Sequence, residues 1–70
     1  MSLTLKQYRI NAGFSQARLA REAGLSRDAV RNAEAGDPVR AETARAIVDA
    51  LNKKLEEKIL VSDIEGLKVL

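Results

Sequence analysis

The feature that most constrains this chain is the three-residue hinge Gly24-Leu25-Ser26, which separates two short helical stretches. A serine precedes each stretch as an N-cap, and the apolar spacing predicts helices over residues 16–23 and 27–35. Glycine favours the left-handed conformation that ends the first helix. Two helices joined so tightly pack at a steep angle only where they approach closely, and the small Ala20 permits that approach. The hinge therefore predicts two short helices that are joined by a tight turn and packed against each other at a steep angle.

Helical patterns also flank this pair of helices on both sides. The segment Thr4-Leu5-Lys6-Gln7 fits a capping box and begins a first helix that stops before Gly13. After the turn Gly36-Asp37-Pro38, a fourth helix begins near Arg40 or Ala41. It carries the longest apolar stripe in the chain, which should form one wall of the core: Ala44, Ile47, Val48, Leu51 and Leu55. The predicted fold class is therefore all-α, with four to five short helices.

The segment after the fourth helix has a weaker pattern. It predicts either a short helix capped by Ser62 or a short strand at residues 59–61. Its many apolar side chains either cover the core of their own chain or form a dimer interface, and the two roles are compatible; they are Ile59, Leu60, Val61, Ile64, Leu67, Val69 and Leu70. We therefore interpret residues 1–70 as a single domain, with residues 55–70 as an apolar tail and candidate dimer interface.

Length and composition limit the chemistry. Seventy residues allow one small core, and the absence of cysteine leaves no disulfide or thiolate metal site. The absence of histidine removes the commonest metal ligand and the usual general base. We therefore expect no catalytic residues, no metal and no cofactor. No apolar run of about 18 residues predicts a membrane span, and no secretory signal is visible at the N-terminus, so a cytoplasmic protein is expected.

The charge is unevenly distributed along the chain. Residues 1–45 carry eight basic and five acidic side chains, a net charge of +3, whereas residues 46–70 carry −1. All seven arginines lie between Arg9 and Arg45. Arginine is the side chain best suited to bidentate contact with phosphate or guanine. Charge alone is as typical of a solvated surface, so the arrangement of these residues has to decide.

Several stretches at mutually consistent spacing carry a family resemblance. They are GFSQARLA, AGLS, AVRNAEAG and ETARAIVDAL, together with Arg9. With these, residues 5–51 resemble the phage repressor and Cro-like (XRE-type) helix-turn-helix DNA-binding family, which implies a lambda-repressor-like bundle. Ala33, Val39 and Arg40 depart from the pattern, where a larger apolar residue, a proline and a small N-cap are usual. The alternative interpretation is a helical hairpin in a small bundle, with alanines raising helix propensity.

In a helix-turn-helix, the third helix enters the major groove. Its outward residues are the base-reading candidates Arg27, Asp28, Arg31 and Asn32. Arginine matches guanine O6 and N7, asparagine matches adenine N6 and N7, and aspartate accepts from cytosine N4. We therefore expect Arg27 and Asn32 to read bases directly, and Arg31 to read a base or bind phosphate. Asp28 equally suits the positive end of the helix dipole without any DNA.

Phosphate contacts are expected beside the third helix. Gln16 begins the second helix, where its side chain and the free backbone amides can meet a phosphate, and the resemblance implies the same role. Arg18 and Arg40 are further candidates, although each equally suits solvated surface. The resemblance implies a different role for Arg9 and Glu34, which should form a partly buried structural ion pair.

The predicted partner is double-stranded DNA. One domain offers too few base contacts for a useful specificity ratio, so we expect a homodimer on a palindromic operator. The simplest role is a Cro-type repressor that blocks a promoter by occupancy. Two alternatives remain: an antitoxin that uses its tail to bind a toxin partner, and a protein-binding module without DNA.

Overall fold

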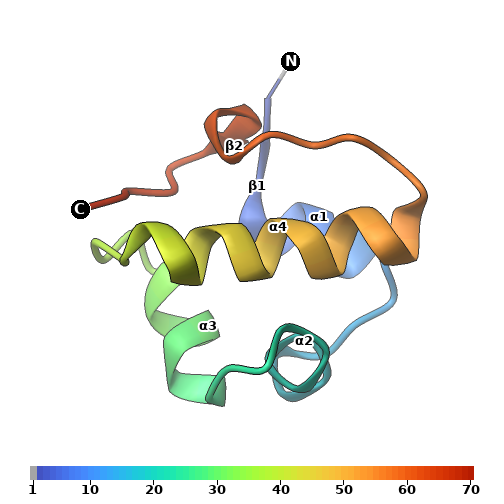
Figure 1. The fold of residues 1–70 in the computed structure, drawn as a ribbon, viewed down its shortest axis with the longest axis horizontal. Coiled ribbons are helices and arrows are strands. Elements are labelled where there is room, and N and C mark those ends of the chain that lie inside the picture. Colours follow the sequence, from blue (N-terminus) through green and yellow to red (C-terminus); the bar gives the residue numbers. More distant parts are fainter. Residues whose placement is uncertain (1) are drawn as a thin grey trace.

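The computed structural model describes residues 2–70, which form four α-helices and one pair of short strands (Figure 1). The helices are α1 (Leu5–Asn11), α2 (Gln16–Ala23), α3 (Arg27–Glu34) and α4 (Ala41–Leu55). The strands are β1 (Leu3–Thr4) and β2 (Ile64–Glu65), and a 3₁₀ helix spans Val61–Asp63. The four predicted helices are confirmed, with α3 ending one residue earlier than expected because Ala35 is its C-cap.

The all-α prediction holds for most of the chain but is slightly overstated, since two short segments near the ends of the chain pair as parallel strands. Leu3 lies opposite Ile64 and Thr4 opposite Glu65 in β1 and β2. An extended segment on a protein surface leaves its backbone N–H and C=O groups without partners unless another segment supplies them. The two-residue β1 supplies them here, and its short length leaves no alternating pattern that the sequence could have revealed.

The prediction for the tail is also corrected. Ser62 does not cap a helix but lies inside the 3₁₀ turn, where the Asp63 carboxylate accepts a hydrogen bond of 2.9 Å from the Leu60 N–H. Residues 59–61 form no strand. Instead, the Asn52 side chain accepts from the Ile59 N–H at 2.7 Å and donates to the Ile59 carbonyl at 3.0 Å. The side-chain amide of Asn52 on α4 thus provides the backbone of Ile59 with the hydrogen bonds that a neighbouring strand would otherwise supply.

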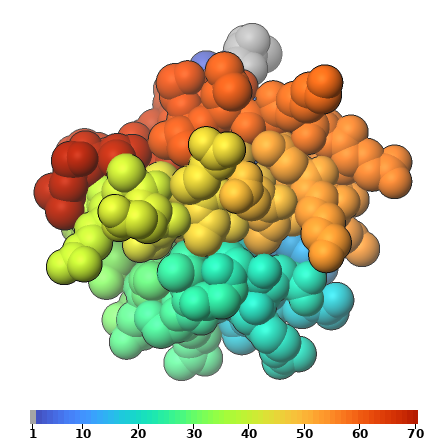
Figure 2. All heavy atoms as spheres, viewed as in Figure 1, coloured from blue at the N-terminus to red at the C-terminus, as the bar shows by residue number. Residues whose placement is uncertain are grey.

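The core lies around α4, which runs between the tail on one side and α2 and α3 on the other (Figure 1). The apolar stripe of α4 is buried except for its last residue, Leu55, which is partly buried, and Ile59 and Ile64 of the tail pack into the same core. Figure 2 shows the same layers, with the surface of α4 between the tail and the α2–α3 pair. The tail therefore covers its own chain, and its most exposed apolar side chains are Leu60 and Leu70. Within residues 2–70, no helix has the length and apolar character needed to cross a bilayer.

Candidate nucleic-acid interface

The hinge between α2 and α3 is a closed hydrogen-bonded turn. Gly24 adopts φ of +71°. Its N–H donates to the Arg21 carbonyl at 3.2 Å, and the Leu25 N–H donates to the Ala20 carbonyl at 2.8 Å. This pair of bonds is a Schellman motif, which ends a helix and turns the chain sharply away. The Ser26 hydroxyl then accepts from the Ala29 N–H at 3.2 Å and starts α3.

The hinge places α3 across α2 rather than alongside it. In Figure 1, α2 is seen almost end-on and α3 from the side, so the two helices cross steeply. Ala20 of α2 and Val30 of α3 are both buried in the core. A bulkier residue than alanine at position 20 would separate the helices, because protein cores are close-packed. The small side chain thus permits the corner that the sequence predicts.

The outward side of α3 is free. Val30 and Ala33 point into the core, and the four base-reading candidates are all exposed: Arg27, Asp28, Arg31 and Asn32. Among residues 2–70, no group forms a hydrogen bond or ion pair with the Arg27 or Asn32 side chain. Both side chains are therefore available to an external partner.

Asp28 and Arg31 contact each other within α3. Arg31 Nη2 lies 3.3 Å from Asp28 Oδ1, and the two side chains are 64% and 69% exposed for arginine and aspartate. An exposed pair of this kind contributes about 0–1 kcal/mol, so an incoming base or phosphate can separate it at little cost. Asp28 also lies in the first turn of α3, where the helix dipole favours a negative charge. The structure thus brings these two candidates together and leaves both on the surface.

An ion pair connects the end of α3 to α1. Arg9 Nε lies 2.5 Å from Glu34 Oε2, and Arg9 Nη2 donates to Glu34 Oε1 at 3.2 Å. The remaining terminal nitrogen of Arg9 donates to the Phe14 carbonyl at 2.9 Å. The side chains are only 12% and 8% exposed for Arg9 and Glu34. This partly buried pair joins α1, the turn before α2, and α3 into one unit.

Gln16 lies beside this ion pair. Its side-chain Nε2 donates to Glu34 Oε1 at 3.2 Å, a contact that the sequence did not predict. A glutamine amide has two N–H donors, so one remains for another acceptor. The Ser15 hydroxyl caps the Arg18 N–H at 3.0 Å, while the first backbone amides of α2 have no acceptor within the helix. The start of α2 therefore combines an oriented side-chain donor with free backbone donors.

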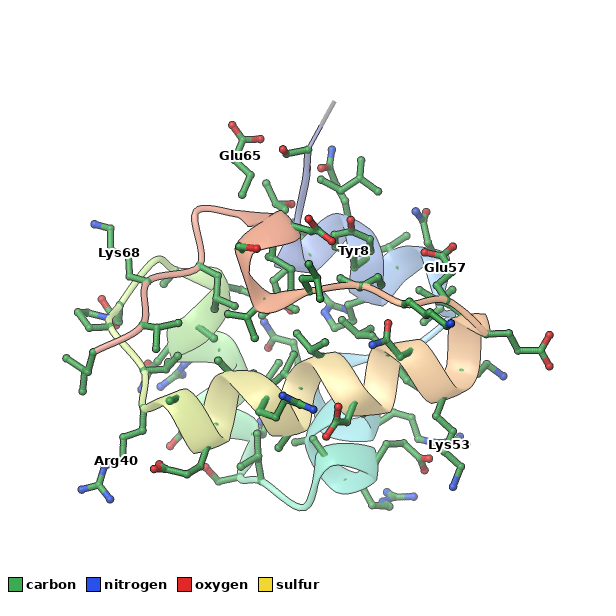
Figure 3. The ribbon with its side chains drawn as sticks, turned by 45° about the horizontal axis from the view of Figure 1, so that its top comes forward. Tyr8, Arg40, Lys53, Glu57, Glu65 and Lys68 are labelled. Carbon is green, nitrogen blue, oxygen red and sulfur yellow. The ribbon has the colours of Figure 1, made fainter. Side chains whose placement is uncertain are left out.

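The two arginine phosphate candidates differ in their surroundings. Arg18 donates to Glu22 at 3.2 Å, and its guanidinium lies 5.6 Å from the centroid of the Phe14 ring. Lys54 of α4 lies 6.0 Å from the same centroid, so Arg18 is turned toward α4. Arg40 is exposed at the N-cap of α4, and Figure 3 shows its side chain extending into solvent. Arg40 is thus the less constrained of the two.

A further contact near α3 was not predicted. The Val39 N–H donates to the Lys68 carbonyl at 2.8 Å, and the Leu70 N–H donates to the Val39 carbonyl at 2.8 Å. These bonds join the connection after α3 to the end of the tail. The only local signal is that Val39 occupies a position where proline is usual in the family that the sequence resembles, because proline has no N–H to donate.

Comparison with known proteins agrees with this geometry. A family model described as helix-turn-helix matches residues 5–58, a range that includes all of α1, α2, α3 and α4. The comparisons with curated proteins and with solved structures gave no match.

Proposed function

Because this chain belongs to the XRE-type helix-turn-helix family, we propose that it regulates transcription by binding specific sequences in double-stranded DNA. One observation carries the proposal: the polar side of α3 is exposed to solvent, while Val30 and Ala33 on its other side are buried in the core. A helix presented in this way fits the major groove of a duplex. The protein acts by binding rather than as an enzyme.

Base reading is assigned to the exposed side of α3. Arg27 and Asn32 have no partner within the described chain, so they can make bidentate contacts with guanine and adenine without breaking a folded-state bond. Arg31 reads a base or binds phosphate once it leaves Asp28. Asp28 can then accept a hydrogen bond from cytosine N4. The division predicts that specificity depends chiefly on Arg27 and Asn32.

Phosphate contacts are assigned to the borders of α3. The start of α2 offers Gln16 and free backbone N–H groups, and the positive end of the helix dipole favours an anion there. Arg40 offers a charge after the end of α3, at the start of α4. Arg18 is a weaker contributor because its guanidinium lies over the Phe14 ring and is turned toward α4. These contacts would set the register of α3 on the duplex.

The proposal includes a homodimer on a palindromic operator, acting as a repressor by occupancy. One copy of α3 provides few base contacts, and a second copy about 34 Å away would read the next turn of the same groove. Leu60 and Leu70 remain 62% and 80% exposed after the tail has packed on its own core, and they are the apolar residues that a second copy would cover.

Selection of bound sequences from a random duplex pool tests the proposal. We expect a preferred motif made of two symmetric half-sites about 10 base pairs apart. Sedimentation at several protein concentrations, with and without the selected duplex, gives the oligomeric state. Enrichment of no motif would contradict sequence-specific binding and favour a protein-binding module, and a motif without two-fold symmetry would contradict the dimer.

Replacing Gln16 by alanine should weaken binding to the selected and to scrambled duplexes by about the same factor. A phosphate contact carries no sequence information, so its loss lowers both affinities. Because glutamine is uncharged, the slope of log affinity against log salt should stay unchanged, whereas Arg40→Ala should reduce that slope by about one. Titrations at three salt concentrations measure both effects. A loss confined to the selected duplex would assign Gln16 to base reading instead.

A further inference from the structure

The connection between α3 and α4, residues 35–40, is short and carries Arg40 at its end. Its first half is fixed by α3 itself: the Gly36 N–H donates to Ala33 at 3.2 Å and the Asp37 N–H donates to Asn32 at 3.0 Å. Its second half has no such local support. The N-cap of α4 is Arg40, which makes no side-chain capping bond, unlike Ser15 and Ser26 at the starts of α2 and α3.

The support for the second half comes from the C-terminal segment, residues 66–70. Val39 exchanges two backbone hydrogen bonds of 2.8 Å with this segment, one with the Lys68 carbonyl and one with the Leu70 N–H. The Gly66 carbonyl oxygen also lies 4.0 Å from the point that a Cβ on Gly36 would occupy. The two stretches of backbone are therefore hydrogen-bonded at Val39 and run close together at Gly36.

Side-chain burial holds the same junction. Val39 is 8% exposed and belongs to the core, and Leu67 is partly buried against that core. Arg40, the next residue after Val39, extends into solvent, and Figure 3 shows that it diverges from Lys68. The C-terminal segment thus affects the position of Arg40 by its hydrogen bonds to the Val39 backbone, and not by contact between the Lys68 and Arg40 side chains.

We propose that the C-terminal segment is a positioning element of the DNA-binding surface: its pairing with Val39 holds the connection and Arg40 in place beside the end of α3. This inference rests on the proposed function. Ordering a loop before association lowers the conformational entropy lost on binding. The tail would then have two roles: it packs on the core, and it holds Arg40 where this side chain can contact a DNA phosphate.

Removal of residues 68–70 tests the proposal. The truncated chain should bind the selected and scrambled duplexes roughly fivefold to tenfold more weakly. Without the two hydrogen bonds to Val39, the connection must be ordered at the moment of binding, and this lowers the affinity. Hydrogen exchange at the Val39 N–H should accelerate in the free protein, and the thermal unfolding midpoint confirms that the chain still folds. The Arg40→Ala substitution should weaken binding markedly in the parent and much less in the truncated chain.

Matched variants separate backbone pairing from other effects. Leu70→Pro removes the N–H that Val39 accepts, whereas Leu70→Ala keeps it, and the Leu70 side chain is 80% exposed. Both variants also remove the Leu70 side chain and any contact that it makes with a second copy, so the effect of the backbone hydrogen bond is the difference between them. The proline variant should therefore bind duplex DNA more weakly than the alanine variant, by part of the truncation effect. Lys68→Ala removes the charge of the segment while keeping both hydrogen bonds, and should bind like the parent.

Three outcomes would overturn the proposal. They are an unchanged affinity after truncation, an equal loss in Lys68→Ala, and an Arg40→Ala effect of the same size in both backgrounds. If the parent itself binds no duplex, the proposed function fails together with this inference. If the parent binds and the truncated chain binds as well, only the positioning role fails.

Discussion

Alanine in place of both Arg27 and Asn32 is expected to remove most of the sequence preference while the duplex is still bound. Each bidentate contact with a base edge is worth about 1–3 kcal/mol of discrimination, so the two single variants should each lose about 5- to 150-fold in preference. Both side chains lie on the exposed face of α3 and have no partner within residues 2–70. The fold should therefore be unaffected. Competition between selected and scrambled duplexes at fixed salt measures the loss.

A control variant separates base reading from loss of positive charge. Arg21→Ala removes one exposed arginine from α2 and leaves α3 intact. It should reduce affinity for selected and scrambled duplexes to a similar and small extent, so the preference between them is retained. If Arg27→Ala and Asn32→Ala retained the preference of the parent for the selected duplex, α3 would not be the reading element.

Alanine in place of Arg9 is expected to destabilise the protein by about 3–5 kcal/mol, as for other buried ion pairs that lose one partner. The Glu34 carboxylate, 8% exposed, would lose its charged partner, and the Phe14 carbonyl would lose its donor. Because small domains unfold with a free energy of about 5–15 kcal/mol, this is a large fraction of the total. Urea unfolding followed by circular dichroism measures the change.

Two comparisons show whether burial causes this effect. Arg45→Ala breaks an ion pair with Asp49 whose side chains are 75% and 63% exposed for arginine and aspartate. That loss should stay below about 1 kcal/mol. The double variant Arg9→Met/Glu34→Leu removes both charges and should recover much of the stability. Equal effects of Arg9→Ala and Arg45→Ala would contradict the assignment of Arg9–Glu34 as the bond that holds α1 and α3 together.

The helices and their limits could be predicted from the sequence because their signals are local. Thr4, Ser15 and Ser26 each accept from the backbone N–H three residues later, as their positions before apolar patterns indicate. Gly24 ends α2 in the left-handed conformation, as the hinge requires. The exposed face of α3 followed from the same periodicity, since Val30 and Ala33 define the buried side. These features depend on residues within one or two helical turns.

The ion pair between Arg9 and Glu34 was predicted, but not from a local sequence pattern. No local pattern joins residues 25 positions apart, and the resemblance to a family supplied that expectation. The Gln16 donor to Glu34 was not predicted, since it exists only because α2 and α3 cross and bring the start of one helix beside the end of the other. The sequence therefore predicted which residues are candidates for the interface, but not the hydrogen bond that connects Gln16 to the ion pair.

The chain's own sequence determined the four helices, the sharp corner at Gly24 and the polar side of α3, since helical hydrogen bonds and caps connect residues three to five positions apart. Only the tertiary structure decided where the tail goes. The pairing of β1 with β2 and of Val39 with the C-terminal segment joins residues about 30 to 60 positions apart through backbone groups that every sequence shares. Apart from the need for an N–H, which proline at position 39 would lack, such bonds leave no residue-specific pattern. They form where packing around α4 brings the backbones together.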